Sequence, residues 1–189
     1  MDAFSYLSVM ISLILGLAIT QVLKGFRGLM HARTRLTVYW PAVLWGILII
    51  VMSVQSWWAM FSLRTHVDWT FLQFSVVLAQ TIVLYLLAAL VLPDVFGDAP
   101  VNLRDHYYDH RGWFFWLLVL VILISLSKSL IMDGALPRPA DVAFHLLFIA
   151  FGISGAVIAR PRYHEALAAF SVFAFGVYIA LLFAHLPRS

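Results

Sequence analysis

Six windows of roughly 20 apolar residues follow one another along this chain, separated by short polar or Pro- and Gly-containing segments. A helix needs about 20 mainly apolar residues to cross a bilayer. Only 11% of the 189 residues are charged, against about a quarter in soluble domains, so the chain lacks the charge to cover a water-facing surface. The sequence therefore predicts an all-α integral membrane protein, a single-domain bundle of six transmembrane helices. The predicted spans are 4–23, 39–63, 69–92, 113–132, 141–159 and 165–186.

The basic residues predict the orientation of these spans. The connections after spans one, three and five contain Lys24, Arg27, Arg33, Arg35, Arg104, Arg111, Arg160 and Arg162. The opposite side has only Arg64, Arg138 and Arg188 at its surface. By the positive-inside rule both termini then lie outside the cytoplasm. The first span lacks a basic leader, so it is expected to stay as a helix and not to be cleaved as a signal peptide.

The basic residues are mostly Arg, and Asn102 is the sole Asn, a bias that fits a GC-rich bacterial genome. We therefore expect a multi-pass protein of the bacterial inner membrane. The basic side chains lie at helix ends and form no patch on a soluble face, so nucleic acid is not an expected partner. The lipid bilayer is, and the stretch from Lys24 to Arg35 is interpreted as an anchor to anionic lipid.

Small residues recur every four positions in three spans, a pattern that lets helix backbones approach closely in lipid. These faces are expected to point inward and to support a homo-oligomer or a larger membrane complex. They comprise Ser8, Ser12, Gly16 and Thr20 in span one, Gly152 and Ala156 in span five, and Gly176, Ala180 and Ala184 in span six.

Polar side chains within the spans collect in the half that lies on the side of the termini. Unpaired polar groups are costly in hydrocarbon, so such a cluster predicts mutual hydrogen bonds or a water-filled cavity. We expect an outward-facing vestibule with its floor near Gln80 and an apolar plug beneath it. The clustered residues are Ser5, Ser8, Ser12, Gln55, Gln73, Ser125, Lys128, Ser129, His145, Tyr178 and His185.

Lys128 is the only basic residue well inside a span, about five residues from the outer end of span four. An ionisable group within a membrane is by default a candidate functional group, here for an anionic solute. The alternative is that the lysine stem extends to the surface, because five residues of helix measure only about 7 Å. The sequence leaves both interpretations open.

Two histidines lie at a depth similar to that of Lys128. His145 follows Asp141 by four residues, so the two share a helix face and the carboxylate can orient the imidazole. His185 shares its face with Tyr178. Each histidine alone is more simply an internal hydrogen-bonding residue. Together with Lys128, however, they place three titratable groups from three helices in one layer, which makes them candidate ligand or ion-binding residues.

Two further sites are considered on weaker patterns. His145 and His185 on separate helices are compatible with bis-imidazole haem ligation, although the chain has no attachment motif. His106 and His110, one helical turn apart in the longest connection, are candidate metal ligands. The favoured alternative for that connection is an amphipathic interfacial helix with Leu103, Tyr107 and Phe114 toward lipid.

The function that these patterns favour is transport of a small polar or anionic solute, or of an ion, through an outward vestibule. The alternatives are an outward ligand sensor or haem-binding subunit without transport, and a scaffold subunit of a membrane complex. The chain has no Cys, no Gly-rich phosphate loop and no nucleophile elbow, so no reaction is specified and a non-enzymatic function is favoured. The mostly apolar inner half argues against a through path, because permeation needs polar contacts or a gate across the full thickness.

Overall fold

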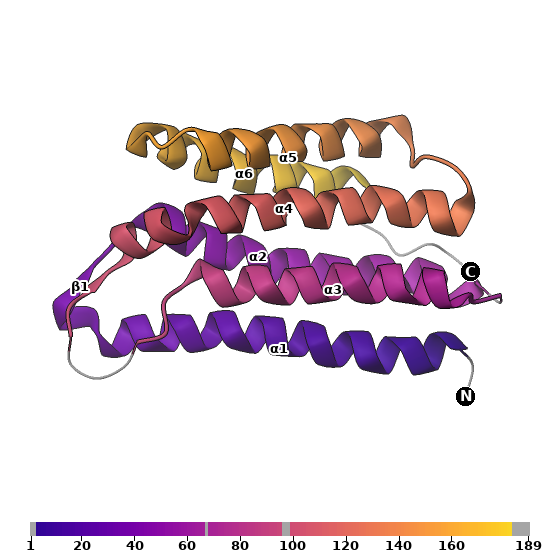
Figure 1. Ribbon diagram of the computed structural model, residues 1–189, viewed down its shortest axis with the longest axis horizontal. Helices are drawn as coiled ribbons and strands as arrows, with labels where there is room; N and C mark the ends of the chain where they lie inside the picture. The colour runs from indigo at the N-terminus through magenta and orange to yellow at the C-terminus, as the bar shows by residue number, and fades with distance from the viewer. Residues whose placement is uncertain (1–2, 67, 96–98, 183–189) are drawn as a thin grey trace.

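Six long helices make up almost the whole of the computed structural model, which describes residues 3–66, 68–95 and 99–182 (Figure 1). Each helix is long and apolar enough to cross a membrane, which confirms the number and order of the predicted helices. The helices are α1 (Ala3–His31), α2 (Trp40–Ala59), α3 (Phe71–Val91), α4 (Leu103–Asp133), α5 (Pro139–Val157) and α6 (Pro161–Leu182).

The helices run alternately up and down between two ends of the bundle (Figure 1). At the N-terminal end lie the start of α1, the α2–α3 and α4–α5 connections, and the end of α6. At the opposite end, the strand β1 (Leu36–Thr37) pairs in parallel with β2 (Val101–Asn102), and we call this the β1–β2 end. This two-residue ladder was not expected from the sequence. Two short 3₁₀ helices, η1 (Arg33–Arg35) and η2 (Met60–Thr65), continue the turns.

Two helices extend well beyond their predicted spans. α1 continues to His31 and not to residue 23, and α4 begins at Leu103 and not at residue 113. The predicted limits followed hydrophobicity, whereas the observed start of α4 is set by a cap. The Asn102 side chain accepts hydrogen bonds from the backbone N–H groups of Arg104, at 3.0 Å, and Asp105. The far end of α4 stops at Gly134, whose φ of 65° is left-handed and suits glycine.

Two glycines allow α5 to pack closely on α4. A Cβ atom added at Gly152 would lie 2.5 Å from Cγ2 of Val119, and one added at Gly155 would lie 2.6 Å from the Phe115 ring. Glycine at these two positions therefore lets the α5 backbone lie directly on α4. Elsewhere α3 packs against α1 and α4, and α2 packs against α1, α3 and α6.

The small-residue faces of spans one and six do not point inward as expected. Ser12, Gly16 and Thr20 on α1 are exposed, and among the described residues a Cβ atom added at Gly16 or Gly176 would have no neighbour within 4 Å. Ala184 lies outside the described residues. The face of α1 that packs into the bundle is aliphatic, because larger side chains fill the groove beside α2 and α3. Its buried residues include Leu7, Ile11, Leu15, Ala18 and Val22.

Candidate functional site

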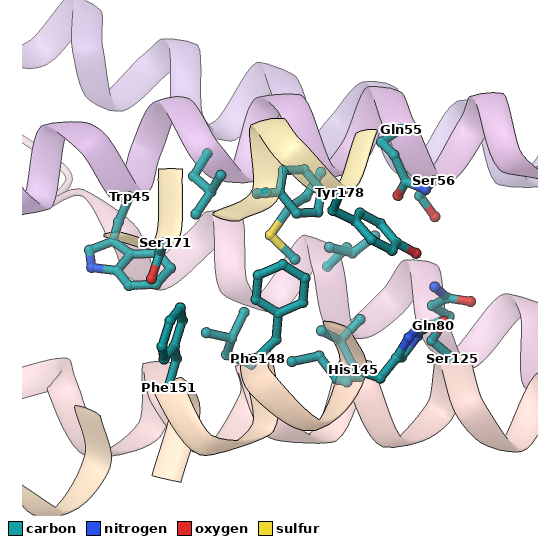
Figure 2. Close-up of a pocket in the computed structure, with 17 residues that line it drawn as sticks. Trp45, Gln55, Ser56, Gln80, Ser125, His145, Phe148, Phe151, Ser171 and Tyr178 are labelled. Carbon is teal, nitrogen blue, oxygen red and sulfur yellow. Dashed lines mark hydrogen bonds between the residues drawn. The ribbon is translucent and has the colours of Figure 1, made fainter. Parts of the chain in front are cut away.

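A cavity lies among α2, α3, α4, α5 and α6 (Figure 2) and extends from the half of the bundle toward the N-terminal end to Trp45 near the β1–β2 end of α2. It has two chambers that share part of their lining. The polar chamber has a volume of about 170 Å³. It is lined by Gln55, Ser56, Ala59, Ser62, Leu63, Gln80, Ser125, Lys128, Ser129, Met132, Asp133, Asp141, His145 and Tyr178.

The apolar chamber lies deeper and has a volume of about 80 Å³. Figure 2 shows Trp45, Phe151 and Ser171 gathered at its far end, opposite the polar side chains. The residues that line only this chamber are Trp45, Leu48, Met52, Leu84, Leu118, Val121, Ile122, Phe148, Phe151, Ser171 and Phe175. The segment below Gln80, expected to be an apolar plug, is therefore partly hollow.

Gln80 lies where the two chambers meet. Its side chain is 8% exposed and lines both of them, as do those of Gln55, Ser56, Ser125 and Tyr178. The cavity thus continues past the residue that the sequence suggested as its floor. The two chambers therefore adjoin at a ring of shared polar side chains, to which His145 also belongs.

Lys128 points into the bundle and not to the surface. Its Nζ donates a hydrogen bond to Oε1 of Gln80 at 3.0 Å. Gln80 is nine residues into α3 from the N-terminal end, whereas Lys128 is only five residues from the end of α4. The ammonium therefore reaches deeper than its own Cα. In the part of the chain that the structure describes, no carboxylate lies within ion-pair distance of this ammonium.

His145 is held by partners on both ring nitrogens. Nδ1 lies 2.8 Å from the backbone oxygen of Asp141 and 3.1 Å from its carboxylate Oδ1. Both oxygens are acceptors, so Nδ1 carries a proton, and Nε2 of the neutral ring accepts from the Ser125 hydroxyl at 3.1 Å. The Tyr178 hydroxyl also interacts with the Asp141 carboxylate. Asp141 is therefore held by α5 and α6 side chains. Lys128 shares the polar chamber with Asp141 and Asp133 and feels their negative charge, but among the described residues it forms no ion pair with either.

Two serine hydroxyls in the cavity have no hydrogen-bond partner among the described residues. Ser56, on α2, is 6% exposed and lies at the junction, and Ser171, on α6, is 2% exposed and lies in the apolar chamber. Buried hydroxyls are normally paired, because an unpaired one costs about 1–3 kcal/mol. Neither serine was predicted as a site residue, because its only signal in the sequence is a polar side chain within an apolar run.

Two of the predicted site residues, Gln73 and His185, are not among the described residues that line the cavity. Gln73 lies outside the cavity lining, because its Oε1 accepts from the backbone N–H of Thr70 at 2.9 Å in a capping box that begins α3. Its Nε2 donates to the Ile131 carbonyl at 3.5 Å and so links α3 to α4. His185 lies outside the described residues, so haem ligation by His145 and His185 stays a prediction.

His106 and His110 lie on one face of α4 near the β1–β2 end, with their ring centroids 4.3 Å apart. Nε2 of His106 donates to the Leu90 carbonyl at 3.1 Å, and Nδ1 of His110 donates to the His106 carbonyl at 2.9 Å. The other nitrogen of each ring has no hydrogen-bond partner within the described segments. Among the described residues no group of three or more His, Cys, Asp or Glu side chains is placed to hold a metal ion, so the metal site stays a prediction.

The interfacial-helix interpretation of this segment is wrong. Leu103, Tyr107 and Phe114 do not face lipid, because they are 0%, 6% and 4% exposed in the bundle core. Tyr107 instead donates its hydroxyl to Nδ1 of His164 at 2.8 Å, and Nε2 of His164 contacts the Ile158 carbonyl. His164 is fully buried, and the sequence analysis overlooked it because it follows Pro161 in a polar connection.

No protein family model, no curated protein and no solved structure matches this chain.

Proposed function

We propose that this chain is a multi-spanning protein of the bacterial inner membrane that transports a small polar or anionic solute, with the polar chamber as its solute site. The observation that carries the proposal is the position of Lys128. Its ammonium lies at the junction of the two chambers and donates to Gln80, with no carboxylate among the described residues in ion-pair distance. A lysine in a membrane interior is expensive, and a binding role accounts for its presence.

The size and chemistry of the polar chamber support the same proposal. Its volume of about 170 Å³ far exceeds the roughly 10–15 Å³ that one water molecule needs. It is lined by donors and acceptors from five of the six helices, α2 to α6, which would keep it hydrated when no solute is bound. The imidazole of His145 uses both ring nitrogens on Asp141 and Ser125, so it fixes the positions of these two polar side chains in the wall of the chamber.

The distribution of basic residues supports an outward opening. Lys24, Arg27, Arg35 and Arg104 lie toward the β1–β2 end, which the positive-inside rule assigns to the cytoplasm. The polar chamber reaches Asp133, an exposed residue at the N-terminal end. A solute would therefore enter from outside the cell.

The test is uptake by proteoliposomes of nitrate, phosphate, methanesulfonate and hexanesulfonate, anions that stay charged in water. We expect uptake of at least one of them, and its loss in Lys128→Ala and in His145→Ala. The matched control is Lys24→Ala, which removes the only other lysine, far from the cavity. Circular dichroism and size-exclusion profiles check that the variants fold. Flux that is unchanged in both cavity variants contradicts the proposal.

A specific observation favours a second function, ligand sensing without transport. The apolar chamber ends at Trp45, whose ring lies edge-on to those of Phe114 and Phe115 at 5.4 and 5.3 Å between centroids. These rings close the cavity toward the β1–β2 end, and a permeation path would need them to move. Lys128-dependent binding without flux in the same proteoliposomes would support the sensor and exclude the transporter.

A further inference from the structure

We infer that the occupant of the cavity is a small amphiphilic organic anion, whose carboxylate binds at Lys128 and whose short apolar tail fills the apolar chamber. This inference rests on the proposed function and names the class of solute. An inorganic anion would need only the polar chamber, and a fully apolar ligand would need only the other. The two chambers form one continuous site with opposite chemistry at its two ends (Figure 2).

The head group is specified at the junction. The Lys128 ammonium has three donors, and one of them is used by Gln80. The unpaired hydroxyl of Ser56 lies at the same junction, on the facing helix α2. A carboxylate offers two oxygens with several lone pairs, so it can accept from both groups at once. Binding would satisfy the buried serine and compensate the lysine charge together.

The tail is specified by what lies directly below the junction. Beyond Gln80 the walls are Leu84, Phe148 and Phe175, with Trp45 at the far end. The volume of about 80 Å³ suits a short alkyl chain or a small ring and excludes a long acyl chain. The apolar chamber is smaller than the roughly 150 Å³ engineered cavity that stays dry and binds benzene. An apolar tail gains free energy by leaving water for this space.

The experiment is calorimetric titration of the protein in lipid nanodiscs at pH 7 with acetate, butanoate, hexanoate and decanoate, with empty nanodiscs as the blank. Each buried methylene contributes about 0.8 kcal/mol, or about fourfold in affinity. We expect the affinity to rise by about fifteenfold for every two methylenes at first, and to stop rising once the tail is longer than the apolar chamber. Hexanol, which has the same tail without the charge, should bind at least tenfold more weakly than hexanoate.

Variants separate the two ends of the site. Lys128→Gln should weaken hexanoate binding at least tenfold, whereas Lys24→Gln should leave it unchanged. Ser171→Leu adds a side chain inside the apolar chamber and should remove the dependence on tail length. Met52→Phe fills the same space from α2, so the test stands if one of the two filling variants fails to fold.

The outcomes distinguish this inference from the proposed function. If the affinity depends on Lys128 but is equal for all four acids, the ligand is not amphiphilic, although the polar chamber is still supported as the solute site. Binding that rises with tail length but ignores Lys128→Gln overturns both. Absence of binding by every acid overturns the amphiphilic ligand, and the proposed function is then decided by the uptake of the inorganic anions and sulfonates. Binding that depends on Lys128 and on tail length, and that loses the tail dependence in a filling variant, supports both.

Discussion

The ammonium of Lys128 donates a hydrogen bond to the side-chain oxygen of Gln80 at 3.0 Å, across 48 residues of sequence. This contact joins α4 to α3 where the polar and apolar chambers meet. A lysine five residues from a helix end could extend to the surface, and here it turns toward the bundle interior. One polar contact between two helices thus decides that the charge lies in a cavity.

Removing the acceptor should release the lysine. In Gln80→Leu the ammonium loses its partner, and its flexible stem can then carry it to water at the N-terminal end. We expect a water-soluble, amine-reactive acylating reagent to modify Lys128 several-fold faster than in the unsubstituted protein. The rate is measured by mass spectrometry, with exposed Lys24 as the internal reference. Gln21→Leu, on α1 and outside the cavity lining, should leave the ratio unchanged. An unchanged ratio in Gln80→Leu would show that the contact does not hold the lysine inward.

The packing of α5 on α4 should depend on Gly155. A methyl group there would lie 2.6 Å from the ring of Phe115, which is fully buried and has no room to move. Overpacking of this kind costs about 1–3 kcal/mol, so Gly155→Ala should lower the midpoint of thermal unfolding in detergent.

The matched control for that substitution is Gly16→Ala on α1, where an added Cβ atom has no neighbour within 4 Å. Alanine is a better helix former than glycine, so this variant should be neutral or more stable by up to about 1 kcal/mol. If Gly155→Ala is as well tolerated as Gly16→Ala, the close approach of α5 to α4 is incorrect.

The hydroxyl of Tyr107 should stabilise the β1–β2 end through His164. The Ile158 carbonyl is an acceptor, so Nε2 of His164 carries the proton and Nδ1 accepts from Tyr107. Tyr107→Phe keeps the ring but leaves the buried Nδ1 unpaired, at an expected cost of about 1–3 kcal/mol in the free energy of unfolding. Tyr6→Phe, at a side chain 63% exposed, is the control and should change nothing. Equal unfolding midpoints for the two variants would argue against a paired, neutral His164.

The orientation can be tested by cysteine labelling, because the chain has no cysteine of its own. Leu136→Cys places a thiol in the exposed α4–α5 connection at the N-terminal end, and Thr34→Cys places one at the exposed β1–β2 end. In intact bacterial cells a membrane-impermeant maleimide should label Leu136→Cys. It should label Thr34→Cys only after permeabilisation. The reverse pattern would mean that the cavity opens toward the cytoplasm.

The candidate site was only partly predictable from the sequence. Lys128, His145, Asp141, Gln55 and Tyr178 were singled out as rare polar groups in apolar spans, and all five line the polar chamber. The sequence could not separate Gln73 from them, because a glutamine in a span and a glutamine in a capping box look alike until the first turn of the helix is located.

The inward direction of α1 shows a second limit of sequence patterns. Small residues at a spacing of four are compatible with either face of a helix, because the pattern records that a close approach is possible and not that a neighbour is present. Gly152 has that neighbour in Val119, and Gly16 has none among the described residues. The difference lies in how α4 and α5 meet, which is a property of the whole bundle.

The sequence by itself determined that this chain forms six long apolar helices, because hydrophobicity and length are local quantities that each segment carries alone. It also showed that Lys128 is the only basic residue well inside a predicted span, which marks it as a candidate functional group. The tertiary structure alone decided that Lys128 meets Gln80, that His145 meets Ser125, and that an apolar chamber lies below them. These relationships arise from the relative rotation and depth of separate helices, and in a bundle those depend on packing between segments far apart in the chain.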